Sequence, residues 1–141
     1  MDYDTLPAPE LGHALRAMTV NLLVRDVEAQ VAFLTACFGM TAHQASADFA
    51  LMLHAGQPIQ LHADATYAAH PLHALLPETP PRGAGIELRL HEADPDQAVA
   101  AAAAFPMATV LQAPTDKPNH GLREAVILCP NGYAWVPSRR I

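Results

Sequence analysis

The stretch that decides the fold is G-I-E-L-R-L-H-E-A-D-P-D, residues 85–96. Its first half alternates apolar and polar residues, which predicts a half-buried strand over residues 86–90. Asp94 then precedes a proline, and an aspartate N-cap followed by proline at the first helical position is a strong helix start. The alanine-rich segment that follows predicts a helix reaching to about Phe105, before Pro106 ends it.

The same pattern occurs earlier in the chain. Residues 18–24, M-T-V-N-L-L-V, predict a strand, and Asp26 follows as the N-cap of a helix that ends at Gly39. Asp26 and Asp94 lie 68 positions apart (94 − 26), so the two strand–helix units can be laid over each other. Each helix is followed by three short predicted strands: 41–45, 49–54 and 58–62 in the first half, and 108–112, 124–128 and 133–136 in the second. The sequence therefore indicates an internal duplication, the alternative being two unrelated strand–helix units in an ordinary α+β domain.

This duplication divides the chain into four parts. Residues 1–16 show no sustained periodicity and are expected to form an N-terminal tail. Residues 17–63 and 85–141 form the first and second βαβββ modules, and the proline-rich residues 64–84 form a linker between them. Together the two modules are expected to make one domain.

Composition excludes several classes of partner. Hydrophobic residues make up 51% of the 141 positions and charged residues 16%, as in a globular chain. The net charge of −6 argues against nucleic acid, and no apolar run approaches the length of a membrane span. The two cysteines make no disulfide framework, and the acidic N-terminus is unlike a signal peptide. We therefore expect a cytoplasmic protein without nucleic-acid or membrane partners, and the absence of glycine-rich phosphate motifs gives nucleotide binding no support.

Three segments carry a resemblance to a known group of proteins. Residues 20–40, V-N-L-L-V-R-D-V-E-A-Q-V-A-F-L-T-A-C-F-G-M, look like its opening strand and helix, and residues 85–96 like its second opening strand. T-D-K-P-N-H-G-L-R-E-A-V-I-L-C-P-N-G-Y, residues 115–133, resembles its closing hairpin. The group is the vicinal oxygen chelate superfamily, which includes glyoxalases, bleomycin-resistance proteins and extradiol dioxygenases. The resemblance implies an α+β fold in which paired βαβββ modules form a cup-shaped mixed sheet with helices outside, usually as a homodimer.

The resemblance also assigns the positions at which metal-using members hold a divalent ion. Carried over position by position, the four slots fall at Thr19, Gln60, Glu87 and Val136. A catalytic metal needs about three protein ligands, and threonine is a poor ligand and valine none. We therefore expect no metal cofactor. The alternative is a divalent metal held with the help of His62 or His91.

Strand alternation predicts which side chains line the cup, because every second residue of a strand shares a face. Glu87 and His62 are the best guesses for a general base, and Arg89 for an anchor of anions or carbonyl groups. A plainer interpretation stands beside each assignment. Glu87 and Arg89 then form a structural ion pair, and His62 is only part of the cup wall. His120, which lies near the cup mouth, is then a residue of a surface loop. The predicted ligand-binding residues are Asn21, Gln60, His62, Glu87, Arg89, His120 and Val136.

From these residues we expect a glyoxalase- or bleomycin-resistance-like protein that binds a small, partly polar organic molecule. Whether it is an enzyme stays open; if it is, a lyase, isomerase or dioxygenase of the glyoxalase type is implied. One alternative function is a metal-dependent lyase, isomerase or dioxygenase with relocated ligands. Another is a non-catalytic interaction protein with a filled cup.

Overall fold

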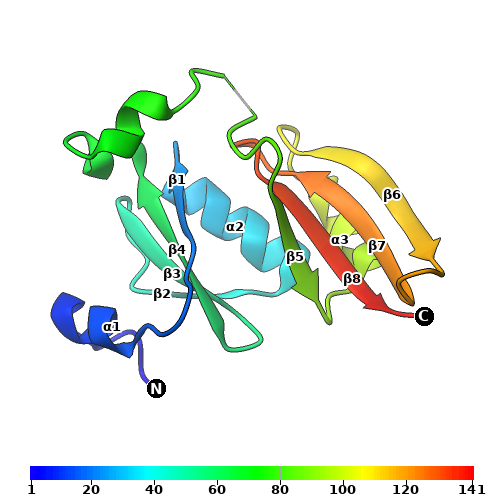
Figure 1. The fold of residues 1–141 in the computed structure, drawn as a ribbon, viewed down its shortest axis with the longest axis horizontal. Coiled ribbons are helices and arrows are strands. Elements are labelled where there is room, and N and C mark those ends of the chain that lie inside the picture. Colours follow the sequence, from blue (N-terminus) through cyan, green and yellow to red (C-terminus); the bar gives the residue numbers. More distant parts are fainter. Residues whose placement is uncertain (80) are drawn as a thin grey trace. The chain divides into compact units, whose positions relative to one another are not determined.

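The computed structural model describes residues 1–79 and 81–141, which form short helices and eight strands (Figure 1). In chain order the elements are α1 (Ala8–Ala14), β1 (Asn21–Val24), α2 (Val27–Phe38), β2 (Thr41–His43), β3 (Phe49–His54), β4 (Gln57–Ala63), the 3-10 helices η1 (Asp64–Tyr67) and η2 (Pro71–Leu75), β5 (Glu87–His91), α3 (Pro95–Ala102), β6 (Thr109–Lys117), β7 (Leu122–Leu128) and β8 (Ala134–Arg140).

The strands form two open four-stranded sheets with the same topology. Their orders are β1-β4-β3-β2 and β5-β8-β7-β6. The first strand of each sheet pairs in parallel with the last strand of its half, and the remaining pairs are antiparallel. The predicted duplication and α+β class are therefore confirmed, with two mixed βαβββ sheets. The joining of the sheets into one cup stays a prediction.

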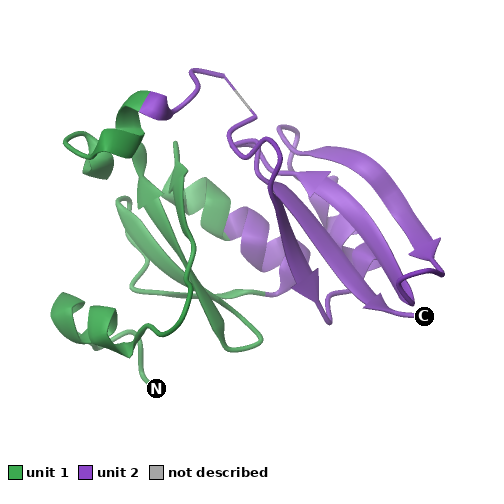
Figure 2. Ribbon diagram, in the orientation of Figure 1, with its two compact units in different colours: residues 1–31, 40–74 green, residues 32–39, 75–141 purple. Residues whose placement is uncertain are grey.

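The chain divides into two compact units, shown in Figure 2. Unit 1 contains residues 1–31 and 40–74 and carries the first sheet, whereas unit 2 contains residues 32–39 and 75–141 and carries the second. The predicted module boundaries at 17, 63 and 85 stay predictions. Within the described residues, no helix is long and apolar enough to cross a membrane.

Local capping signals in the sequence are confirmed. The carboxylate of Asp26 accepts a hydrogen bond from the backbone N–H of Ala29 at 3.0 Å, and that of Asp94 accepts one from the N–H of Asp96 at 3.0 Å. Gly39 has a φ of 68°, the left-handed conformation in which glycine ends a helix without strain. These contacts start both helices and end the first where the sequence predicts.

Each unit has its own core. In unit 1, Leu22, Met52 and Leu61 are buried on one face of the sheet. In unit 2, Trp135 is 1% exposed, and its ring lies 5.8 Å from that of Phe38 between centroids. Burying such large apolar side chains supplies the main driving force for folding.

Several element boundaries differ from the prediction. The first strand begins at Asn21 rather than Met18, which is 81% exposed, and β5 begins after Ile86, which is 59% exposed. The helix α3 ends at Ala102, three residues before the predicted end at Phe105. Hydrophobic alternation therefore placed these elements correctly but did not fix their ends, because apolar residues outside a strand need not be buried.

Two segments predicted to be irregular contain short helices. The predicted tail includes α1, whose Leu11 is buried, and the predicted linker 64–84 includes η1 and η2. Pro80 of this linker lies outside the described residues. A seven-residue helix such as α1 is too short to be stable alone, so its burial against the rest of unit 1 stabilises it.

Candidate functional site

The first sheet places three predicted site residues on one face. In the strand register Asn21 lies opposite Gln60, and both Leu23 and Phe49 lie opposite His62. Residues opposite each other in a sheet project to the same side, and so do residues two positions apart on a strand. Asn21, Gln60 and His62 therefore share the face turned away from Leu22, Met52 and Leu61, as predicted.

A cavity of about 310 Å³ lies over part of this face. One side is formed by the polar side chains of Gln44, Gln60 and His62 together with Phe49, and the other side by α1 and Leu15. The lining is Ala8, Leu11, Gly12, Leu15, Gln44, Phe49, Gln60 and His62. The helix that the sequence did not predict thus contributes apolar lining to a cavity that also has the polar side chains of Gln44, Gln60 and His62 in its lining.

The imidazole of His62 has an unusual environment in this cavity. Its ring packs between Phe49, at 5.2 Å between centroids, and Tyr67, at 5.1 Å. The Nε2 atom is buried and has no hydrogen-bond partner among the described residues. Burial lowers the pKa of His62, because it disfavours the charged ring. The ring is therefore neutral near pH 7.

Tyr67 connects His62 with Asn21. The side-chain amide nitrogen of Asn21 donates a hydrogen bond to the Tyr67 hydroxyl at 3.2 Å, and the Tyr67 ring lies 4.7 Å from that of His70. Sequence reasoning missed Tyr67 because it lies in η1, within the predicted linker. A single aromatic residue in a proline-rich segment gives no periodic signal.

The segment before α1 is attached to the neighbouring β2 strand. The carboxylate of Asp4 lies 3.2 Å from Nδ1 of His43 and accepts a hydrogen bond from the backbone N–H of Gln44 at 3.1 Å. The hydrogen bond from the Gln44 backbone is the largest of the effects that lower the pKa of Asp4. The Gln44 side chain donates to the carbonyl of Leu6 at 2.9 Å. These contacts hold the N-terminal segment where α1 can cover the cavity.

On the second sheet, Glu87 and Arg89 form the ion pair that the sequence allowed, and a third residue completes it. Arg89 donates to Glu87 at 3.0 Å and also to Glu124. The Glu124 side chain is 8% exposed, against 57% for Glu87. The pKa of Arg89 is raised, chiefly by its hydrogen bond to Glu124. Sequence reasoning missed Glu124, although a charged residue inside an apolar strand was the available signal.

The remaining predicted residues do not join these groups. Val136 is fully buried, His120 lies in the exposed turn between β6 and β7, and Thr19 is half-buried just before β1. His91 lies at the end of β5, beside a different cavity. Within residues 1–79 and 81–141, no three His, Cys, Asp or Glu side chains are grouped so that they could hold a metal ion.

Comparison with known proteins identifies the fold. No protein-family model and no curated protein matches the sequence. Solved structures do match. One is a glyoxalase/bleomycin resistance protein/dioxygenase family enzyme from Burkholderia phytofirmans PsJN, with a TM-score of 0.71 and 23% identity over 87% of this chain and 97% of that one. Another is a glyoxalase/bleomycin resistance protein/dioxygenase from Nocardioides, with a TM-score of 0.63 and 20% identity over 94% of this chain and 91% of that one. A third, a glyoxalase/bleomycin resistance protein from Albidiferax ferrireducens T118, has a TM-score of 0.63 and 20% identity over 87% of this chain and 97% of that one. The chain therefore has the fold of the glyoxalase/bleomycin resistance/dioxygenase proteins, which confirms the resemblance to the vicinal oxygen chelate superfamily at the level of fold.

Proposed function

We propose that this protein binds a small, partly polar organic molecule on the face of its first sheet, and that it does so without a metal. The observation that carries the proposal is the 310 Å³ cavity lined by His62, whose Nε2 atom is buried and has no hydrogen-bond partner within the part of the chain that the structure describes. A buried polar atom without a hydrogen bond costs free energy, about 1–3 kcal/mol, and a ligand that supplies the missing bond removes that cost.

The chemistry of the cavity defines the ligand class. The neutral imidazole of His62 can donate or accept one hydrogen bond, and the Gln60 amide can do both. Leu11 and Leu15 supply apolar contact from α1 on the other side. A cavity of this size and mixture suits a compact molecule with an apolar body and one or two hydroxyl, amide or carbonyl groups.

The side chains of this chain at the four metal-ligand positions of the fold's metal-using members argue against a bound divalent ion. Thr19 and Val136 provide no effective ligand. The carboxylate of Glu87 is already bonded to the guanidinium of Arg89, a fixed cation that would repel a second cation beside it. The residues present therefore do not fit a metal. Elemental analysis of the purified protein should find less than stoichiometric Zn, Ni, Fe or Mn; about one equivalent per chain would favour the metal-dependent alternative.

The ligand proposal is tested by a thermal-shift screen of metabolites, thiol conjugates and antibiotics on the parent protein. Hits are then repeated on His62→Leu and Gln60→Leu, with His73→Leu as the matched control, since His73 is an exposed residue of η2. We expect the ligand-induced shift to fall strongly in the first two variants and to be unchanged in the control. Equal shifts in all variants would show that the ligand binds elsewhere.

Two further variants test the contribution of the second sheet. If Glu87 and Arg89 contact the same ligand, Glu87→Ala and Arg89→Ala reduce the ligand-induced shift as well. If they act only as a structural ion pair, the melting temperature of the ligand-free protein changes, while the ligand-induced shift does not.

Homodimer formation is a further proposal. A light-scattering mass of one chain would contradict it.

A further inference from the structure

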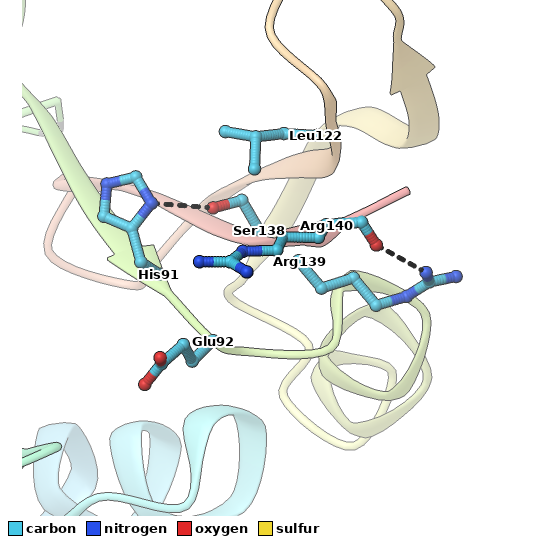
Figure 3. Close-up of a pocket in the computed structure, with 6 residues that line it drawn as sticks. All are labelled: His91, Glu92, Leu122, Ser138, Arg139 and Arg140. Carbon is cyan, nitrogen blue, oxygen red and sulfur yellow. Dashed lines mark hydrogen bonds between the residues drawn. The ribbon is translucent and has the colours of Figure 1, made fainter.

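A second cavity lies in unit 2, and none of its lining residues lines the cavity at His62. Its volume is about 550 Å³, within the range of about 300–1,000 Å³ that is usual for ligand pockets. Figure 3 shows its lining, which is His91, Glu92, Leu122, Ser138, Arg139 and Arg140. None of these residues has a part in the proposed His62 site.

The strand register explains why four of these side chains meet. His91 lies opposite Ser138, and Leu122 lies opposite Arg140, so all four project from the same face of the second sheet. The Ser138 hydroxyl is 3.4 Å from Nδ1 of His91, which limits the orientations open to the imidazole. Arg139, the intervening residue of β8, projects to the opposite face.

The two arginines differ in their partners. Arg139 lies 3.9 Å from the carboxylates of both Asp94 and Asp96, and it donates to the backbone carbonyl of Arg140 at 3.2 Å. The guanidinium of Arg140 has no carboxylate partner among the described residues, and its side chain extends toward His91 and Ser138 in Figure 3. An arginine left without a counterion beside a cavity, in a chain of net charge −6, offers a site for an anion.

The geometry points to a binding site for a small organic carboxylate at Arg140. The planar guanidinium matches a carboxylate through two parallel hydrogen bonds. His91 forms the facing polar wall, and Leu122 provides an apolar surface for the body of the molecule. Glu92 lies at the same cavity and adds a negative charge, which repels a dianion such as phosphate about twice as strongly as a monoanion. The site therefore selects a monoanion with an apolar group.

NMR titration of the full chain with benzoate tests this inference, with benzamide as the neutral probe of the same shape. The signals of Leu122 are followed in the parent, in Arg140→Gln and in Arg16→Gln, and those of the Arg140 side chain in the two proteins that keep it. Arg16 is an exposed arginine that does not line this cavity, so it serves as the control. We expect benzoate, but not benzamide, to shift these signals, and Arg140→Gln to weaken benzoate binding by about tenfold or more while Arg16→Gln leaves it within about twofold.

Three results would overturn the inference: no saturable benzoate shift in the parent, equal binding of benzamide, or equal weakening by both arginine variants. Both side chains are exposed, so loss of folding is not expected, and circular dichroism of each variant verifies this. Because His62 and Gln60 are untouched, the outcome is independent of the function proposed for the first sheet.

Discussion

The ion pairs of Arg89 give the sharpest prediction about stability, because its two carboxylate partners differ in exposure. Glu124 is 8% exposed and Glu87 57%. Replacing Arg89 by methionine preserves most of the side-chain volume but leaves Glu124 as a buried charge without its partner. Breaking a buried pair in this way costs about 3–5 kcal/mol. The Arg89 side chain is itself 31% exposed, so water screens part of the loss, and we expect about 2–3 kcal/mol.

The partner variants supply the comparison. Glu87→Gln removes an exposed ion pair and should cost no more than about 1 kcal/mol. The double variant Arg89→Met/Glu124→Leu removes the orphaned charge as well, so it should be more stable than Arg89→Met alone. Urea unfolding followed by fluorescence is suitable, because the only tryptophan, Trp135, is 1% exposed and lies in the same unit.

The reasoning is refuted if Arg89→Met costs no more than Glu87→Gln. It is also refuted if the double variant is less stable than Arg89→Met by the full cost of a second lost interaction. Either result would mean that water, rather than Arg89, stabilises the Glu124 carboxylate.

Three further predictions concern single positions. Because the pKa of His62 is lowered in the folded protein, the unfolded chain binds the proton more readily, and the free energy of unfolding should decrease as the pH falls below about 6.5. The urea concentration at the unfolding midpoint, measured across this pH range, should lose this contribution to its pH dependence in His62→Leu but keep it in His73→Leu. Gly132 has a φ of 87°, and a Cβ there would lie 2.4 Å from the Cα of Pro81, so Gly132→Ala should cost about 3 kcal/mol or more; a parent-like melting temperature would show that the turn can rearrange. Asp94→Ala removes the α3 N-cap and should cost about 1 kcal/mol in chemical unfolding, whereas Asp94→Asn, which can still cap the helix, should lose less than half of that.

Much of the fold could be predicted because its signals are local. An aspartate N-cap acts on a backbone group within three residues, as Asp26 and Asp94 do. Alternation along a strand fixes which of its side chains share a face, so Gln60 and His62 were placed together, and the fold implied by the resemblance placed Asn21 of another strand with them. The repetition of both signals 68 residues apart was enough to indicate two βαβββ modules.

The site required long-range contacts that no periodicity reports. Apolar lining of the first cavity comes from α1, which is stable only when Leu11 is buried against the rest of its unit. The buried partner of Arg89 is Glu124, 35 positions further along the chain. The sequence by itself thus determined the modules, the helix starts and the polar faces, because capping and alternation act between near neighbours. Only the tertiary structure decided what covers those faces and which charges are buried, because burial depends on residues that are distant in the chain and adjacent only once it has folded.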